Sequence, residues 1–463
     1  MSHSTRRHFL KTTAKATLAT GVLTGGCGSA QRAPRPDSTY MGGYAATPLA
    51  TVRAAFIGVG ARGPQHLTNF ATLPGTEVVA VCDLYEDLAT KWAGQATMLG
   101  GGTRHLTPRT YFGTPDAWRQ MLQEVRPDVV FIATNWTNHA PMAIAAMEAG
   151  AHAFVEVPIA VTLDEMWDIV DTSERTKRHC MMLENVNYSR DELLFLHLVR
   201  RGMIGELLHA EAAYIHELRW QMEEQERSTG SWRTGHYARR NGNLYPTHGL
   251  GPVAQYMNIG RTDDTFRRLV SYSTPAVGRA AYAAANYPDT HRWNQLTYGG
   301  GDLNTSIIKT QLGRTVLVQW DETSPRPYTR LNLIQGTKGC LAGFPTRVAL
   351  EGGVPGATEN HHRWAQGEQL AALYERYDHP LYKRLNDRTK DSGHGGMDGL
   401  MMVRIVECLQ GGLPLDQNVY EGCLWSAVAP LSEASVAADG APQDFPDFTR
   451  GRWRETKPLE IVG

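Results

Sequence analysis

The sequence is poor in several features that would assign it to a definite class of protein. Its 463 residues include only six cysteines, at positions 27, 82, 180, 340, 408 and 423, with no CxxC pair. This scarcity excludes a disulfide framework and a cysteine-rich zinc site, so we expect mostly buried free thiols. The formal net charge is only −1, which provides no basic surface field. We therefore expect no nucleic-acid partner.

The remaining composition is typical of a folded globular chain, with 42% apolar and 20% charged residues. The length exceeds one ordinary core and indicates two domains. We divide the chain into an export signal over residues 1–30, a linker over 31–50, a dinucleotide-binding domain over 51–185 and a second domain over 186–463. The linker is rich in proline and glycine, and we expect it to have no core of its own.

The first 30 residues resemble a bacterial twin-arginine export signal. Arg6-Arg7 precede a short, weakly apolar run, which is too broken by lysine and threonine to span a membrane. That pathway carries folded proteins, which suits an enzyme that binds a nucleotide before export, so we expect a periplasmic protein. Two alternatives stay open, namely a lipid anchor at Cys27, which ends a run resembling a lipoprotein box, and cleavage after Ala30.

Residues 52–83 hold the most informative pattern. An apolar strand leads into a GxGxxG turn, a helix from near Pro64, a second strand and Asp83. Gly58 permits the tight turn, Gly60 permits a pyrophosphate to approach the backbone, and Gly63 permits close packing of helix and strand. An acid about 20 residues later can bind the adenosine ribose hydroxyls and would repel a 2′-phosphate. The pattern predicts NAD rather than NADP.

Strands and helices alternate from residue 52 to residue 183, with further strands expected at 129–134, 151–155 and 179–183. This alternation predicts an α/β fold with a doubly wound parallel sheet, a Rossmann domain. The loop 135–139 follows a buried strand, so we expect it to line the nicotinamide half of the site. Thr137 or Asn138 can also cap the following helix, and both roles can coexist.

The pattern changes after residue 188. A helix at 193–201 precedes strands expected at 207–215, 267–273, 304–312, 315–320 and 329–335, with a hairpin turn at 313–314. We predict a C-terminal α/β domain with an open, mostly antiparallel sheet. The charged segment 217–243 shows little periodicity and is expected to be a long loop over the site. Segments 397–409 and 424–437 are expected to be closing helices.

Several motifs together resemble the Gfo/Idh/MocA oxidoreductase family. They are the glycine turn, Asp83, Asn138-His139, Glu156-Val157-Pro158 and residues 203–207. Motifs of the second half resemble the NAD-dependent glycosidases of glycoside hydrolase family 109, in the subgroup of α-N-acetylgalactosaminidases. These motifs are ENVNY at 184–188, GNLYPTHGLG at 242–251, RPYTR at 326–330 and HGGMD at 394–398.

The resemblance implies two sets of binding residues. The cofactor set is Gly58, Gly60, Arg62, Gly63, Asp83, Trp136, Asn138, His139, Glu156, Val157 and Asn185. The substrate set is Tyr214, Arg233, Tyr245, Pro246, Thr247, His248 and Tyr328. The implied partner is a small-molecule glycoside or glycan.

The resemblance also implies a redox-neutral mechanism with retention at the anomeric carbon. NAD+ oxidises sugar carbon 3, a base removes the carbon 2 proton, the aglycone leaves, water adds and the hydride returns. His248 is the candidate acceptor for the carbon 3 hydroxyl proton, with Tyr245 in its network. Tyr188 is the candidate for the carbon 2 proton.

One departure from the wider family favours the hydrolase. Its sugar dehydrogenases usually have Glu-Lys-Pro where this chain has Glu156-Val157-Pro158, and valine cannot move a hydroxyl proton. The alternatives are an exported sugar oxidoreductase of the same fold and a non-catalytic sugar-binding protein.

The sequence predicts no metal site. His361, His362 and His394 lack acidic or cysteine ligands at zinc spacing, and we expect His394 to pack beside the helix that starts near Met397. Because an exposed sheet face of this fold often mediates dimers, a homodimer is a further expectation.

Overall fold

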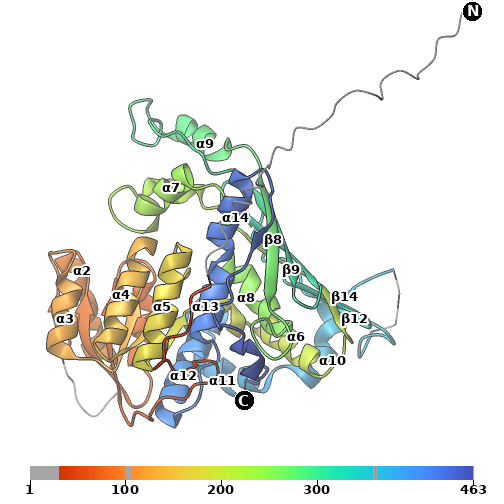
Figure 1. Cartoon of the computed structure of the whole chain (residues 1–463), viewed down its shortest axis with the longest axis horizontal. Helices are drawn as coiled ribbons and strands as arrows, with labels where there is room; N and C mark the ends of the chain where they lie inside the picture. The colour runs from red at the N-terminus through yellow and green to blue at the C-terminus, as the bar shows by residue number, and fades with distance from the viewer. Residues whose placement is uncertain (1–30, 101–106, 358–359, 361, 462–463) are drawn as a thin grey trace, which may run out of the picture.

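The computed structural model describes residues 31–100, 107–357, 360 and 362–461. Two sheets lie on opposite sides of the molecule, and the C-terminal helices run between them (Figure 1). Within the described residues, no helix combines the length and apolarity needed to cross a membrane.

The first sheet belongs to a Rossmann domain, as predicted. Its strands are β1 (Val52–Ile57), β2 (Thr76–Cys82), β3 (Arg109–Tyr111), β4 (Val129–Ile132), β5 (His152–Val155) and β6 (Cys180–Met182). All neighbours are parallel, in the order β3-β2-β1-β4-β5-β6. This order reverses beside β1, so the crevice for a dinucleotide opens at the carboxyl ends of β1 and β4.

Helices cover this sheet because its strands are apolar on both faces. They are α1 (Gly63–Ala71), α2 (Glu86–Leu99), α3 (Ala117–Val125), α4 (Trp136–Glu148) and α5 (Leu163–Thr176). In the core, Phe56 stacks on Phe131 with ring centroids 4.8 Å apart, and Phe70 of α1 meets Phe56 edge-on at 5.8 Å. These contacts fix α1, and with it the glycine turn, against the sheet.

The second sheet has nine strands, in the order β14-β13-β12-β11-β7-β10-β9-β8-β15. Only β7 and β10 pair in parallel, so the sheet is mixed and mostly antiparallel. Its strands are β7 (Leu207–Ile215), β8 (Phe266–Ser273), β9 (Asn304–Thr310), β10 (Thr315–Asp321), β11 (Leu333–Gly336), β12 (Gly339–Ala342), β13 (Arg347–Leu350), β14 (Ala365–Gln366) and β15 (Gln443–Asp444).

Helices cover one face of the second sheet and fill the space between the domains. They are η1 (Asn185–Tyr188), α6 (Arg190–Arg200), η2 (Arg219–Glu223), α7 (Thr229–Arg239), α8 (Thr247–Tyr256), α9 (Gly278–Asn286), η3 (Gly367–Leu370), α10 (Ala371–Tyr377), α11 (Pro380–Thr389), η4 (His394–Gly396), α12 (Met397–Gly411), α13 (Val419–Ser426), α14 (Val428–Ala437) and η5 (Arg452–Glu455). Helix α8 packs closely on β7 because a Cβ at Gly249 would lie 2.3 Å from the backbone nitrogen of Ala213.

The C-terminal helices tie the two domains together (Figure 1). Helix α12 packs on α1, α13 packs on α5 and β6, and α14 packs on β8. The last part of the chain thus holds the substrate domain against the helix that follows the glycine turn.

Three predictions about the second domain were wrong in detail. Segment 217–243 is not one long loop, since it contains η2 and α7, whose Trp232 and His236 pack on Trp136. Segment 424–437 forms the end of α13 and the whole of α14. Strand β11 starts at Leu333 because Leu331 and Asn332 have positive φ angles of 57° and 48°, which interrupt an extended chain.

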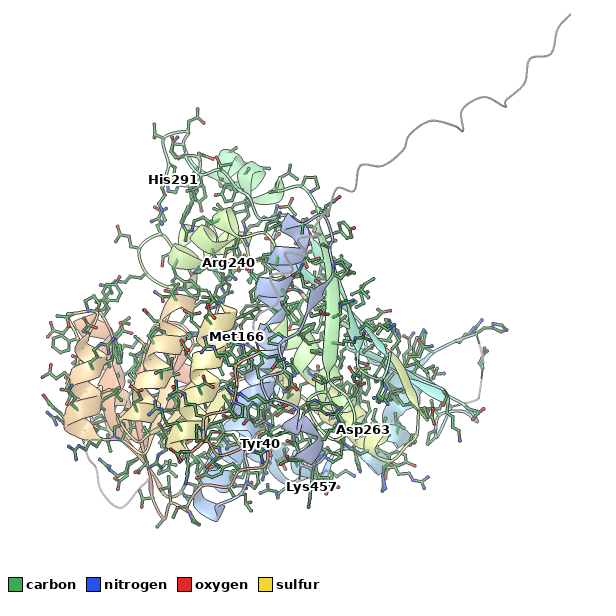
Figure 2. All side chains as sticks on the ribbon, in the orientation of Figure 1. Tyr40, Met166, Arg240, Asp263, His291 and Lys457 are labelled. Carbon is green, nitrogen blue, oxygen red and sulfur yellow. The ribbon has the colours of Figure 1, made fainter. Side chains whose placement is uncertain are left out.

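Residues 31–50 contain no helix or strand, as expected of a linker, yet they pack on the folded domains. Tyr40, which is labelled in Figure 2, is part of this segment. Its ring stacks on that of Tyr420 of α13 with centroids 5.1 Å apart, and Met41 is buried. The backbone nitrogen of Leu49 donates to the carbonyl of Leu409 in α12. Aromatic packing therefore orders a segment that has no core of its own.

Candidate active site

A cavity of about 810 Å³ opens between the two domains. The Rossmann domain contributes the glycine turn and the ends of its strands, and the second domain contributes β7, η2, α7 and the start of α8. Of the residues predicted for the site, the cavity is lined by Gly58, Gly60, Arg62, Asp83, Trp136, Asn138, His139, Glu156, Val157, Asn185, Tyr214, Arg233, Tyr245 and His248. The fold thus brings both predicted halves of the site together.

The glycine turn fits a dinucleotide. Gly58 has a φ of +83°, and a Cβ there would lie 2.6 Å from the carbonyl oxygen of Ala133. A Cβ at Gly63 would collide with the carbonyl of Gly58, so both positions require glycine. A Cβ at Gly60 would meet no atom within 4 Å, so its backbone is open to the cavity. This open backbone at a helix N-terminus is where a pyrophosphate can bind.

Asp83 follows β2 and stands next to this turn. Its Oδ2 accepts from the backbone nitrogen of Val59 at 2.8 Å, and its Oδ1 accepts from that of Tyr85 at 3.0 Å. The two bonds orient the carboxylate at the rim of the cavity and leave lone pairs for further donors. That geometry suits the binding of ribose hydroxyls.

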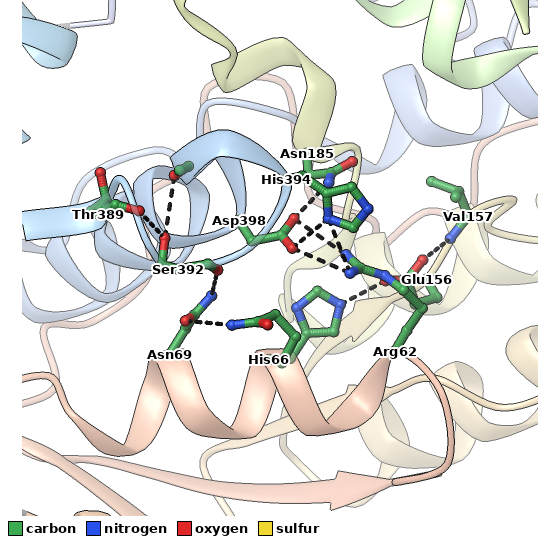
Figure 3. Close-up of polar contacts among 12 residues, drawn as sticks. Arg62, His66, Asn69, Glu156, Val157, Asn185, Thr389, Ser392, His394 and Asp398 are labelled. Atoms are coloured by element: carbon green, nitrogen blue, oxygen red, sulfur yellow. Dashed lines mark hydrogen bonds and ion pairs between the residues drawn. The ribbon is translucent and has the colours of Figure 1, made fainter. Parts of the chain in front are cut away.

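Arg62 joins the glycine turn to α12 (Figure 3). Its Nε donates to Glu156 Oε1 at 3.2 Å, and its two terminal nitrogens each donate to Asp398 at 3.2 Å. Asp398 also pairs with His394 Nδ1 at 2.8 Å and accepts from Asn185 at 2.5 Å. Arg62 is therefore fully paired between the two domains.

The charges of this network perturb both carboxylates. Burial alone would raise the pKa of Glu156, but Arg62 and His66 outweigh burial and hold that pKa well below its usual range. For Asp398, burial is likewise outweighed by the hydrogen bond from His394 and by the charge of Arg62, so its pKa is also lowered. Both groups remain ionised at neutral pH. His394 lines the cavity as well as packing beside α12.

The loops after β4 and β5 support each other. His139 Nδ1 lies 2.7 Å from the carbonyl oxygen of Pro158, and its Nε2 lies 3.1 Å from that of Thr134. Burial lowers the pKa of His139. The ring thus bridges two strand ends at the predicted nicotinamide half, beside Trp136 and Val157.

His248 is held by a buried carboxylate. It lies in the first turn of α8, and its Nδ1 is 2.6 Å from Oε1 of Glu184, whose side chain is fully buried at the end of β6. We infer that Nδ1 carries a proton and donates to Glu184, which leaves Nε2 as a free proton acceptor. Glu184 Oε2 has no partner among the described residues. Such a carboxylate and imidazole pair suits a general base.

Aromatic rings and one unpaired cation form the substrate wall. Tyr245 and Tyr214 lie with their ring centroids 4.9 Å and 5.2 Å from that of His248. The guanidinium of Arg233 lies 5.1 Å from the ring centroids of both Trp136 and Tyr245. Its Nε is buried without a partner among the described residues. An unpaired guanidinium over aromatic rings offers donors to a ligand.

Five predicted residues lie outside the cavity lining, and one of them is Gly63, which packs against the carbonyl of Gly58. Pro246 and Thr247 are buried at the start of α8. Tyr328 touches the lining residues His216 and Tyr214, at 4.9 and 6.2 Å between ring centroids.

Tyr188 is the fifth, and its position does not favour the role expected from the sequence. It is buried, and its hydroxyl donates to Asp416 Oδ2 at 3.1 Å; neither residue is among those that line the cavity. Burial raises its pKa well above the usual value. We therefore assign no acid–base role to Tyr188.

Sequence reasoning missed three residues of the site, namely Glu184, His216 and Asp398. Glu184 lies two residues after β6 and His216 directly follows β7, so a rule that searches the carboxyl ends of strands would have found them. Asp398 belongs to a quoted motif, but its partner Arg62 is 336 residues away, so no local pattern joins them.

His361 lies outside the described residues, and His362 is exposed. Within the ranges that the structure describes, no three His, Cys, Asp or Glu side chains gather as a metal site. The five cysteines in those ranges are free thiols, and all but Cys340 are buried.

Comparisons with known proteins agree with this arrangement. Residues 52–184 match the description "Oxidoreductase family, NAD-binding Rossmann fold", and residues 188–455 match "Glycosyl hydrolase 109, C-terminal domain". The chain is 54% identical to glycosyl hydrolase family 109 protein 1 of Akkermansia muciniphila, and 50% identical to a glycosyl hydrolase family 109 protein of Shewanella pealeana. Each alignment covers 99% of both chains.

Solved structures show the same fold at low identity. A levoglucosan dehydrogenase in complex with NADH matches with a TM-score of 0.64 and 18% identity, over 86% of this chain and 100% of that chain.

Proposed function

Since the chain belongs to glycosyl hydrolase family 109 and is an NAD-dependent glycoside hydrolase, we propose that it cleaves its substrate by oxidation, elimination, addition and reduction. The observation that carries this mechanism is the position of His248. Its Glu184-bound ring faces the cavity whose other wall is the glycine turn. A proton acceptor and a dinucleotide cradle thus face one substrate space.

NAD, when bound, supplies a hydride acceptor for carbon 3 of the sugar and is restored at the end of the cycle. The chain supplies the proton chemistry. Nε2 of His248 accepts the proton of the carbon 3 hydroxyl, and the buried Glu184 stabilises the resulting imidazolium. Gly58, Gly60 and Asp83 hold the cofactor, since their backbone and carboxylate face the cavity.

An ordinary sugar dehydrogenase is less well supported. Val157 stands where that class places a lysine, and no lysine is among the described residues that line the cavity. The hydroxyl proton must therefore leave through His248. The buried carboxylate of Glu184 favours His248 as a base that takes up one proton and returns it in each catalytic cycle.

The substrate is proposed to be an α-N-acetylgalactosaminide. The unpaired donors of Arg233 suit the carbonyl of an acetamido group or a sugar hydroxyl. The rings of Tyr214 and Tyr245 provide an apolar surface for the sugar ring.

We also propose export by the twin-arginine route, because Arg6-Arg7 precede a weakly apolar run. Changing both arginines to lysine should retain the protein in the cytoplasm. Recovery of that variant in the periplasm at the normal level would contradict the route. Labelling with radioactive palmitate would distinguish a lipid anchor at Cys27 from cleavage after Ala30.

A panel of nitrophenyl glycosides tests the activity, and reaction in deuterated water tests the mechanism. Hydrolysis by elimination should place deuterium at carbon 2 of the released sugar, with no net NADH in solution. Hydrolysis without deuterium at carbon 2 would exclude the elimination. Accumulation of free NADH without release of nitrophenol would identify a dehydrogenase.

A further inference from the structure

A second hydrogen-bonded pair of side chains faces the cavity, separate from His248 and Glu184. The Tyr214 hydroxyl lies 2.9 Å from Nδ1 of His216, and both residues line the cavity. Tyr214 is the penultimate residue of β7, and His216 directly follows that strand. The rings of Tyr214 and His248 lie 5.2 Å apart between centroids. Two histidines with different partners thus meet in one pocket.

The proposed function, on which this inference rests, needs two proton acceptors. His248 takes the proton of the carbon 3 hydroxyl and is then an imidazolium. It cannot also take the proton of carbon 2. Tyr188 cannot do so either, because its hydroxyl points to Asp416 outside the cavity lining.

Three other titratable groups that line the cavity are less suited to this step. Glu156 is bound by Arg62 and His66. His139 faces a backbone carbonyl with each ring nitrogen. Tyr245 has no hydrogen-bond acceptor for its hydroxyl among the described residues, so it has no group to receive its proton. Tyr214 differs because its hydroxyl lies 2.9 Å from Nδ1 of His216, which can accept the hydrogen bond when the ring proton is on Nε2.

We propose that Tyr214 and His216 form the acid–base pair for carbon 2. The Tyr214 oxygen takes the proton from carbon 2 while its own hydroxyl proton moves to Nδ1 of His216. The C–H electron pair forms the double bond between carbons 2 and 1, and the C1–O bond breaks with both electrons on the aglycone oxygen. Water protonates that oxygen and becomes hydroxide. The hydroxide adds to carbon 1, and the pair returns its proton to carbon 2.

The surroundings suit a relay through a neutral pair. Burial raises the pKa of Tyr214 well above its usual value, so no standing tyrosinate is available. Burial also lowers the pKa of His216, so the imidazole is neutral, and its Nδ1 can accept a proton when the ring proton is on Nε2. Proton transfer to His216 therefore replaces ionisation of the tyrosine.

The test supplies the ketone directly, as a methyl 3-keto glycoside of N-acetylgalactosamine in deuterated water. Loss of the carbon 2 proton signal in the NMR spectrum reports the step without any oxidation of the substrate. We expect Tyr214→Phe and His216→Phe to slow this exchange by about a hundredfold or more. With the ordinary glycoside, both variants should still form enzyme-bound NADH, which a merely structural defect would not spare. Tyr272→Phe, on an exposed part of β8, is the matched control and should exchange at the wild-type rate.

Exchange at the wild-type rate in either variant would overturn the pair while leaving the proposed function intact. Absence of exchange in the wild type would overturn the elimination mechanism itself, and the pair with it. Should His216→Phe fail to fold, His216→Gln keeps a hydrogen bond to Tyr214 but cannot hold the proton. Wild-type exchange in His216→Gln would also overturn the proposal.

Discussion

Two of the arginines that line the cavity, Arg62 and Arg233, differ in their partners. Arg62, on the cofactor side, makes three hydrogen bonds to the carboxylates of Glu156 and Asp398. Arg233, on the substrate side, lies over aromatic rings, and its Nε is buried without a partner in the described part of the chain. Loss of one partner of Arg62 would leave a buried charge uncompensated, whereas the orphaned Nε of Arg233 is a donor that a ligand can use. On the cofactor side, Arg62 thus also links the two domains. On the substrate side, Arg233 is available to bind a ligand.

The largest expected effect comes from a substitution on the substrate side of the cavity. His248→Ala should lower hydrolysis and the formation of enzyme-bound NADH by about a hundredfold or more, because both require loss of the hydroxyl proton. The amount of NAD that copurifies should stay at the wild-type level. Rates with an aryl glycoside and absorbance of the bound cofactor measure this. Full NADH formation in the variant would show that another group takes that proton.

A second substitution removes the ion pair between Asp398 and Arg62 on the cofactor side. Asp398→Asn removes the charge that faces Arg62, and loss of one partner of a buried ion pair should lower the free energy of unfolding by about 3 kcal/mol. Denaturant unfolding measures it, with Asp444→Asn on the exposed Arg268 pair as the control. An unchanged midpoint would mean that Arg62 is stable without its partner.

The same network predicts an acid dependence. The pKa of Asp398 is lowered in the folded state, so its stabilisation is fully present above the unfolded value of about 3.9 and is lost as pH falls through the folded value. Stability of the wild type should therefore fall more steeply below about pH 4 than that of Asp398→Asn.

A third change sharpens the contrast by removing the unpaired cation. Arg233→Met should lower kcat/KM by about tenfold to a hundredfold, as expected for loss of a charged hydrogen bond to the substrate. Because no protein carboxylate loses a direct partner, the unfolding midpoint should not fall. Arg233→Lys keeps the charge without the planar fork and should recover only part of the activity. A lower midpoint in Arg233→Met would contradict the distinction between the two arginines.

A smaller effect is expected at the ribose end. Asp83→Ala should weaken NAD by about tenfold and reduce discrimination against NADP, because the charged acceptor for the ribose hydroxyls is lost. Calorimetric titration of cofactor-free protein with each nucleotide measures both effects. Unchanged affinity for both would remove Asp83 from the cofactor site.

The smallest effect concerns a contact that crosses the cavity. Arg227 of the substrate domain pairs with Asp87 at 2.9 Å and lies 3.9 Å from the ring centroid of Tyr85, two residues after Asp83. Arg227→Ala should speed NAD release by only about twofold to fivefold, because exposed ion pairs contribute little. Arg268→Ala is the matched control. An equal acceleration in both variants would exclude a specific role for Arg227.

Much of the fold follows from local patterns. The glycine turn and Asp83 could be located because strand, turn, helix and acid occupy adjacent positions along the chain, and a single βαβ unit sets their geometry. Strand β7 was predicted with its observed bounds, since alternation of buried and exposed residues is itself a local signal. The segment 217–243 could not be predicted, because its helix is stabilised by packing on Trp136 of the other domain.

The sequence by itself therefore determined the cofactor cradle, the two-domain order and the motif that carries His248, because each depends on residues close together in the chain. Tertiary structure alone decided which groups face each other. It turned Tyr188 towards Asp416, paired Tyr214 with His216, and brought Asp398 to Arg62 from 336 residues away. The physical reason is that charge pairing and burial depend on distance in space, and only the packing of α12 on α1 brings Asp398 close to the glycine turn.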